Sequence, residues 1–144
     1  MKVYADSSFL ISLTVEDGNS DAARRFMLKH RHALPFNPLH RLEVRNGIRL
    51  RVHRKELDAV RRDAALRQIE DDLTDGLLFH QAMPWTDALR RAESLSTSHT
   101  EKTGTRAADT LHVAAAMITG VKRFLSFDRR QRLLARAAGL EVKP

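Results

Sequence analysis

The sequence contains four acidic residues whose positions suggest a shared metal site. We call Asp6, Glu43, Asp109 and Asp128 the acidic quartet. Asp6 directly follows a short apolar run at residues 3–5, and Asp128 directly follows the run at 124–127. Converging carboxylates raise one another's pKa unless a cation offsets their charge. Oxygen ligands in a chain without cysteine suit Mg²⁺ or Mn²⁺, ions that activate water and neutralise phosphoryl groups. These acids therefore indicate metal-assisted chemistry on a phosphodiester.

Each acid also has a purely structural explanation. Asp6 and Asp128 could each cap the helix that follows, because a side-chain oxygen at that position accepts backbone N–H groups. Asp109 lies in a first helical turn, where the helix dipole favours an acid. Glu43 could pair with a neighbouring arginine on the surface, which contributes little stability. These explanations weaken when the acids are considered jointly, because two follow predicted strands and a third begins an apolar helix.

The charge balance favours a polyanionic partner. The 144 residues include 25 Lys and Arg against 18 Asp and Glu, for a formal net charge of +7. A basic surface attracts nucleic acid, although basicity alone names no activity. The absence of cysteine excludes a disulfide scaffold, and no apolar run approaches the length of a membrane span. With no signal-peptide pattern at the N-terminus, we expect one cytoplasmic domain over residues 1–144.

Short apolar runs alternate with helical patterns along the chain. Strands are expected at residues 3–5, 33–36, 77–79, 124–127 and 140–142. Helices are expected from residue 7 or 8 and over about 20–27, 42–52, 55–73, 86–95, 107–119 and 131–138, with a loop at 96–105. This alternation predicts an α/β fold with a parallel sheet of four or five strands covered by helices on both faces. Such sheets bind ligands at the carboxyl ends of their strands, where Asp6 and Asp128 are expected.

Four stretches of the sequence, in this order, resemble the acidic motifs of the PIN-domain family: VYADSSFLI, HRLEVRNGI, RAADTLHVAAA and FLSFDRRQ. The third stretch, with Arg106, Asp109, Leu111, His112 and Ala114, is the most specific. The resemblance covers residues 2–142 and is closest to the VapC-type toxins of bacterial toxin–antitoxin pairs. It implies a three-layer α/β/α sandwich around a central parallel sheet, and cleavage of RNA with Mg²⁺ or Mn²⁺.

The resemblance also implies a role for each motif residue. The acidic quartet of this chain matches the catalytic, metal-binding acids of the family. Ser7 matches the small hydroxyl residue after the first aspartate, and Ser126 matches the Ser or Thr before the last. Both serines are expected to hydrogen-bond ligand oxygens or waters, and Arg106 is expected to contact an RNA phosphate. Water activated by the metal is expected to displace the ribose 3′ oxygen and leave a 5′-phosphate.

The partners implied by the resemblance are an RNA substrate, a second copy in a homodimer, and a small antitoxin whose C-terminal segment enters the active-site groove. The predicted function is that of a metal-dependent endoribonuclease, the toxin of such a pair. A housekeeping RNA-processing nuclease of the same fold and a non-catalytic nucleic-acid-binding PIN module are the alternatives. A receiver or haloacid-dehalogenase-like phosphatase needs paired acids after the first strand, where this chain has Asp6-Ser7-Ser8.

Other conspicuous side chains are expected to serve structure or solubility. His112 is expected to pack and hydrogen-bond, and seven histidines without spaced pairs make no zinc site. The acidic run at residues 70–75 is expected to be solvated. Residues 41–67 carry nine basic against four acidic side chains, net +5. This helical pair is predicted either to face RNA or antitoxin, or to be a solvated surface.

Overall fold

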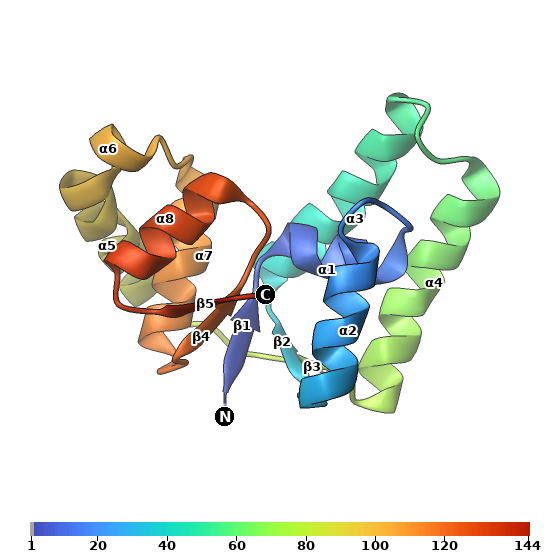
Figure 1. The fold of residues 1–144 in the computed structure, drawn as a ribbon, viewed down its shortest axis with the longest axis horizontal. Coiled ribbons are helices and arrows are strands. Elements are labelled where there is room, and N and C mark those ends of the chain that lie inside the picture. The colour runs from blue at the N-terminus through green and yellow to red at the C-terminus, as the bar shows by residue number, and fades with distance from the viewer. Residues whose placement is uncertain (1) are drawn as a thin grey trace. The chain divides into compact units, whose positions relative to one another are not determined.

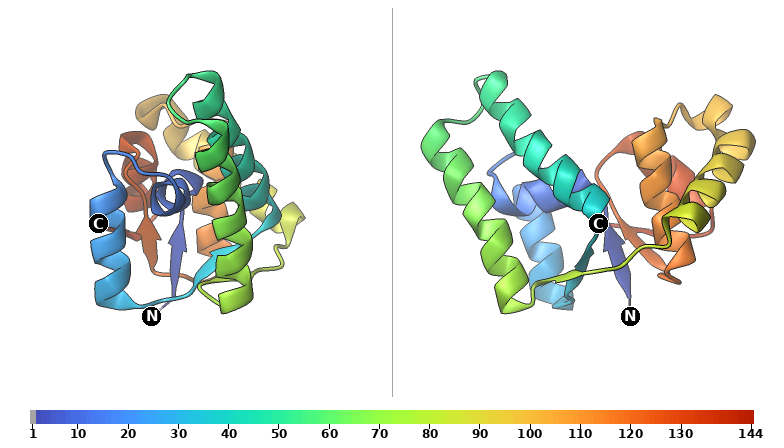
Figure 2. Two further views of the ribbon diagram at one scale, coloured as in Figure 1. Left: turned by 90° about the vertical axis from the view of Figure 1, so that its right-hand side faces the viewer. Right: turned by 180° about the vertical axis from the view of Figure 1, so that it is seen from behind.

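The computed structural model describes residues 2–144, which group into two compact units. The first unit comprises residues 2–6 and 82–144, and the second comprises residues 7–81. Figures 1 and 2 show the elements of each unit. The chain leaves the first unit between Asp6 and Ser7, so its N-terminal strand belongs with the C-terminal half. The prediction of one domain over residues 1–144 stays a prediction.

The first unit is a parallel sheet packed against helices. Its strands are β1 (Val3–Ala5), β4 (Arg123–Leu125) and β5 (Glu141–Lys143), in the order β1-β4-β5. Its helices are α5 (Trp85–Leu95), the π-helix η1 (Ser96–Thr100), α6 (Glu101–Thr103), α7 (Ala107–Ile118) and α8 (Arg129–Ala137). Tyr4 lies opposite Phe124 in the β1–β4 register, and their stacked rings have centroids 5.9 Å apart. One hydrophobic core joins these rings to Leu95, Val113 and Leu134 of the helices.

The second unit pairs a short parallel sheet with four longer helical segments. The strands β2 (Leu34–Phe36) and β3 (Leu78–His80) are parallel neighbours. The helices are α1 (Ser7–Thr14), α2 (Ser20–His30), α3 (Pro38–His53) and α4 (Ala59–Asp75), and Figure 2 shows α3 and α4 joined end to end by a turn. Helix α3 approaches α1 closely at Gly47, where an added Cβ would lie 2.6 Å from Ile11 Cδ1. A side chain at position 47 would therefore require the terminal methyl group of Ile11 to move.

The ends of α3 and α4 follow from local chemistry. Asn37 caps α3 by accepting the N–H of His40, whose ring accepts the N–H of Asn37 in return, and Pro38 occupies the first turn. Asp58 caps α4 by accepting the N–H of Arg61 at 2.8 Å. Helix α4 ends at Gly76, whose φ of +80° is the left-handed conformation that glycine adopts without strain.

The predicted α/β class is confirmed, with five strands whose pairings are all parallel. Hydrogen bonds join these strands as a set of three and a set of two. Four strands, those expected at 33–36, 77–79, 124–127 and 140–142, each start one residue away from their predicted starts. Within residues 2–144, no helix combines the length and apolarity needed to cross a membrane.

Several predicted boundaries differ from the structure, among them the start of α3 at Pro38 rather than near residue 42, and three have identifiable reasons. The helix expected from residue 55 begins at Ala59, because Asp58 is the residue that caps it. The helix expected from Thr86 begins at Trp85, with Pro84 at the cap position. The loop expected at residues 96–105 is largely helical, because hydroxyls such as that of Thr97 bond back to the carbonyl four residues earlier instead of breaking the helix.

Asp17 ties together the turn between α1 and α2, and we expect it to stabilise the second unit. Its carboxylate accepts the hydroxyl of Ser12 at 2.9 Å and the N–H of Asn19 at 2.8 Å, and it pairs with Arg51 of α3 at 3.0 Å. Burial would raise the pKa of Asp17, but these three donors favour its charged form, and the pKa is lowered overall. The charged carboxylate is therefore part of the folded structure.

Asp17→Asn is expected to lower the free energy of unfolding by about 1–3 kcal/mol at pH 7. A carboxyl group whose folded pKa is lowered contributes stability above its unfolded pKa of about 3.9 and loses it as the pH falls through the folded pKa. The difference between the parent and the variant should therefore shrink at pH 3 in urea-unfolding curves. The exposed Asp75→Asn is the control. An equal difference at both pH values would contradict the assignment.

Candidate active site

Asp6 is a fully buried carboxylate at the carboxyl end of β1. It has 0% of its surface exposed, and its N–H donates to the carbonyl of Leu125 at the end of the neighbouring strand β4. The hydroxyl of Ser126, the next residue, donates to Asp6 Oδ2 at 2.6 Å. Because a buried charge is costly unless it is hydrogen-bonded or paired, the sheet holds Asp6 at this edge with a dedicated donor.

Asp128 lies at the same edge, two residues beyond Ser126. Its N–H donates to Ser126 Oγ at 3.0 Å, so one hydroxyl connects Asp6 and Asp128. Its Oδ1 accepts the N–H of Gln131 at 2.8 Å, which makes Asp128 the cap of α8. Capping is therefore a real structural role of this acid. The capping hydrogen bond uses Oδ1 of Asp128, so the other carboxylate oxygen, Oδ2, could bind a metal ion.

Asp109 lies in the first turn of α7, a helix that is fastened to β1. The hydroxyl of Tyr4 and Nδ1 of His112 are 2.7 Å apart, and this buried hydrogen bond fastens α7 to β1. Asp109 lies one turn before His112 on α7, and Asp6 lies two residues after Tyr4 on the same side of β1. Because α7 leads through a short turn into β4, its first turn points toward the carboxyl ends of the strands. Asp109 and Asp6 thus belong to the same end of the first unit.

Glu43 belongs to the second unit, on α3. It is half-buried, and its Oε1 accepts the hydroxyl of Ser7 at 2.9 Å. Ser7 is the first residue of α1 and directly follows Asp6 in the chain. Each of the two serines singled out in the sequence therefore donates to a carboxylate of the acidic quartet, Ser7 to Glu43 and Ser126 to Asp6.

The donor chemistry of these residues fits a hard divalent cation. All four quartet members offer carboxylate oxygens. Serine hydroxyls donate hydrogen bonds to two of these carboxylates, Glu43 and Asp6, as supporting groups do in metal sites. Among residues 2–144, no group of three or more His, Cys, Asp or Glu side chains is arranged so as to hold a metal ion. A single metal site formed by the whole quartet stays a prediction.

The structure also resolves the roles of side chains outside the quartet. His112 is 1% exposed and bonded to Tyr4, which confirms its predicted packing and hydrogen-bonding role. Glu70, in the acidic run at residues 70–75, is exposed to solvent as predicted, and it also pairs with Arg41 at 2.8 Å and lies 3.7 Å from Arg45. Glu70 of α4 is thus neutralised by arginines of α3. The sequence pattern of a single helix could not reveal this contact between two helices.

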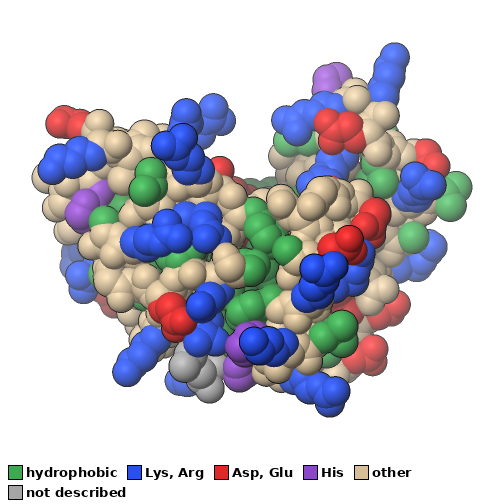
Figure 3. Space-filling model, viewed as in Figure 1, with side chains coloured by type: hydrophobic (Ala, Val, Ile, Leu, Met, Phe, Trp, Pro, Cys, Tyr) green, Lys and Arg blue, Asp and Glu red, His purple; other side chains and the backbone are tan. Residues whose placement is uncertain are grey.

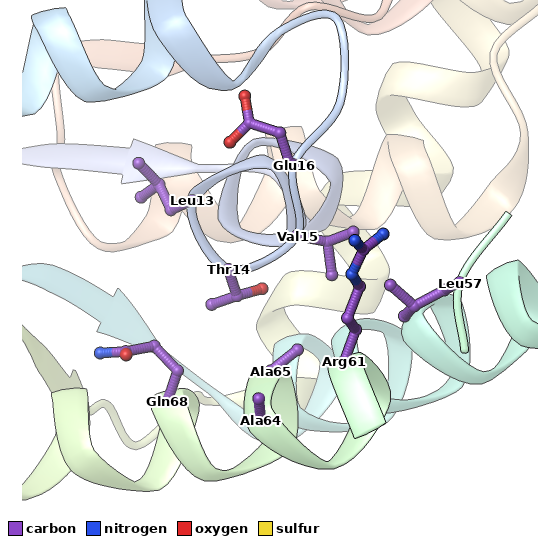
Figure 4. A pocket seen from close by; sticks show the side chains of 9 residues that line it. All are labelled: Leu13, Thr14, Val15, Glu16, Leu57, Arg61, Ala64, Ala65 and Gln68. Carbon is purple, nitrogen blue, oxygen red and sulfur yellow. The ribbon is translucent and has the colours of Figure 1, made fainter. Parts of the chain in front are cut away.

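Two hollows of the second unit lie apart from the quartet. One, of about 280 Å³, lies between the end of α1 and α4, and Figure 4 shows Arg61 of α4 beside Val15 and Gln68 on the side of Leu13 and Thr14. The other, of about 540 Å³, is lined mainly by apolar side chains such as Leu77. Neither hollow contains a quartet residue, so neither offers an alternative centre for carboxylate chemistry.

Comparison with known proteins identifies the family. A search of curated proteins finds no match. VapC20 of Mycobacterium tuberculosis, described as a Sarcin-Ricin loop cleaving toxin, is similar in structure, with a TM-score of 0.71 and 17% identity over 99% of this chain and 100% of that one. PAE2754 from Pyrobaculum aerophilum has a TM-score of 0.65 and 18% identity, over 99% and 89% of the two chains. FitAcB from Neisseria gonorrhoeae has a TM-score of 0.67 and 14% identity, over 99% and 96%.

At identities below one fifth, these three structures establish a shared fold. The sequence itself matches the model of the PIN domain over residues 3–138, a range that includes all four members of the acidic quartet. The chain therefore belongs to the PIN domain family, as its acidic motifs predict.

Proposed function

We propose that this protein is a metal-dependent endoribonuclease that acts as the toxin of a toxin–antitoxin pair. The observation that carries the proposal is the buried Asp6, which Ser126 links to Asp128 at the carboxyl edge of a parallel sheet. Open α/β sheets bind their ligands at this edge. Membership of the PIN domain family and the structural likeness to VapC20, described as a Sarcin-Ricin loop cleaving toxin, support RNA as the substrate.

The acidic quartet would hold the ion. A bound Mg²⁺ or Mn²⁺ supplies a Lewis acid that offsets the charge developing on the phosphodiester. The remaining tasks belong to the chain. Ser126 and Ser7 keep Asp6 Oδ2 and Glu43 Oε1 oriented, and a quartet carboxylate takes the proton of the attacking water. The ribose 3′ oxygen leaves, and the product carries a 5′-phosphate.

Cations of the first unit are the best candidates for contacts to RNA phosphates. Arg106, at the cap position of α7, and Arg129 and Arg130, at the start of α8, are exposed. A Cβ on Gly104 would lie 3.8 Å from Arg130 Nε, so α8 runs beside the segment that leads to Arg106. Figure 3 shows Lys and Arg side chains gathered over α8. Within residues 2–144 none of these three arginines takes part in an ion pair.

The basic side chains of α3 and α4 differ in part, because some of them are neutralised by acids of the same unit. Of the nine basic residues at 41–67, four are paired with acids: Arg41, Arg45, Arg51 and Arg62. An exposed ion pair contributes little stability, but it does reduce the charge that a polyanion meets. We therefore assign the RNA phosphates to the unpaired arginines of the first unit rather than to the helix pair α3–α4.

The variant Arg106→Gln/Arg130→Gln should bind RNA more weakly than its parent, whereas Arg41→Gln/Arg45→Gln should bind nearly as well. Each lost phosphate contact should reduce the slope of log K against log salt by about 0.7 for a single strand. Fluorescence anisotropy with a labelled RNA oligonucleotide, in an Asp6→Asn background that prevents cleavage, measures both. Equal slopes for the two double variants would show that the contacts lie elsewhere.

The partners proposed here are RNA, a small antitoxin and a second copy of the chain, in the cytoplasm. Co-expression with the reading frame beside the gene tests the toxin role: that frame should relieve growth arrest and co-purify with the protein. If it does neither while cleavage persists, the housekeeping nuclease is the better description.

Incubation of the purified protein with total cellular RNA tests the activity directly. Cleavage is expected with Mg²⁺ or Mn²⁺, should stop when a chelator is added, and should return when excess ion is restored. New ends should accept ligation as 5′-phosphates. If RNA is bound but not cut under any of these conditions, the protein is instead a non-catalytic nucleic-acid-binding module.

A further inference from the structure

We propose that Arg132 is a positioning residue that fixes Asp6 and Asp128 through Ser126 and thereby sets the affinity of the site for a divalent cation. The inference rests on the proposed function, because it concerns the metal site of that function. Arg132 lies on α8, one turn after the cap residue Asp128, and is half-buried. Nothing in the four acidic motifs points to it, since it follows the last motif acid by four residues.

Ser126 is held at every polar atom. Its N–H donates to the carbonyl of Lys143 at 3.0 Å, and its hydroxyl donates to Asp6 Oδ2 at 2.6 Å while accepting the N–H of Asp128. Its carbonyl oxygen accepts Nη1 of Arg132 at 2.6 Å. A residue bonded on all sides has little freedom to turn, so the direction of its hydroxyl, and with it the orientation of Asp6, is fixed.

Arg132 is the charged member of this arrangement. The same Nη1 that donates to Ser126 also donates to the carbonyl of Pro144 at 3.1 Å. Hydrogen bonds from a cation are stronger than neutral ones, so this nitrogen clamps the loop after β4 against the end of β5. Because Arg132 and Asp128 share the first turn and a half of α8, the clamp also fixes the end of the helix that carries Asp128.

Two consequences distinguish this role from simple packing. Loss of the clamp should loosen two carboxylates at once, and supporting groups of this kind typically change metal affinity 10–100-fold. Since both hydrogen bonds come from a single nitrogen, a lysine ammonium can form them both. A lysine should therefore replace Arg132 in function, although it lacks the guanidinium plane and is shorter by one atom.

Mn²⁺ binding to the full chain without RNA tests the proposal, measured by the loss of the free-ion signal in electron paramagnetic resonance. Arg132→Gln is expected to weaken Mn²⁺ binding at least tenfold, and Arg132→Lys is expected to stay within about threefold of the parent. Arg136→Gln, an exposed arginine one turn later on α8, is the matched control and should bind as the parent does. Thermal unfolding of each variant reports whether it is folded.

The possible outcomes test the proposed function and the role of Arg132 separately. If the parent does not bind Mn²⁺, the proposed function fails and this proposal fails with it. If the parent binds and a folded Arg132→Gln binds equally well, the positioning role alone is wrong. If Arg132→Gln does not fold, Arg132→Lys decides: retained affinity supports the clamp, and a tenfold loss in a folded lysine variant overturns it.

Discussion

Asp6→Asn is expected to reduce RNA cleavage by about a thousandfold or more and to leave the fold intact. The substitution removes one negative charge and changes the shape of the side chain very little. An amide oxygen can still accept the hydroxyl of Ser126, so the bond that holds residue 6 at the edge of the sheet survives. What is lost is the anionic oxygen that a divalent cation requires.

Cleavage of labelled RNA with Mg²⁺, measured beside urea-unfolding curves, separates these effects. Asp71→Asn makes the same chemical change at an exposed position of α4 and is expected to cleave like the parent. Combining Asp6→Asn with Asp109→Asn should cost little more than either alone, because groups that act as a unit are not additive. If Asp6→Asn cut RNA at the parent rate, the metal assignment would be wrong.

Asp128 performs a structural task that is already visible, and two substitutions separate it from the proposed catalytic one. Asparagine caps helices about as well as aspartate, so Asp128→Asn should preserve the bond to the N–H of Gln131 and keep the parent stability. Alanine cannot cap, so Asp128→Ala should lower the free energy of unfolding by about 1 kcal/mol. Both should lose cleavage about a hundredfold or more, because both lack the carboxylate.

The decisive comparison is therefore Asp128→Asn against Asp128→Ala in the same two measurements. A matched control is Asp58, which caps α4 through the N–H of Arg61 and lies outside the quartet. Asp58→Ala should lose stability and keep its activity. If Asp128→Asn retained full activity, this acid would be a cap and nothing more.

Sequence patterns foresaw most of what positions the quartet. Apolar runs placed β1, β2 and β4 to within a residue or two, because buried parallel strands have a continuous apolar pattern. The strands β3 and β5, which are largely exposed, start within one residue of their predicted positions. The Ala-rich stretch at 107–119 was predicted as a helix and is α7. The carboxyl-end rule then placed Asp6 and Asp128 at one edge, and the hydrogen bonds of Ser126 to both residues agree with that placement.

What sequence patterns missed depends on contacts between distant residues. The pairing of Glu70 with Arg41 spans 29 positions, and the contact of Arg132 with the end of β5 is set by how a helix packs on a strand. Periodicity describes one element at a time and carries no information on such pairs. The helical segment at 96–103 was missed for a different reason, since serine and threonine favour turns unless their hydroxyls bond back along a helix.

The absence of a side chain at Gly47 allows α1 and α3 to approach closely near the hydrogen bond between Ser7 and Glu43. Ser7 of α1 contacts Glu43 of α3, and Ile11 contacts Gly47, each four residues further along its helix. The two helices therefore lie side by side and run in the same direction. An interior glycine costs a helix about 1 kcal/mol in intrinsic preference. That penalty accompanies a close approach of the two helices: even an alanine at position 47 would require the terminal methyl group of Ile11 to move.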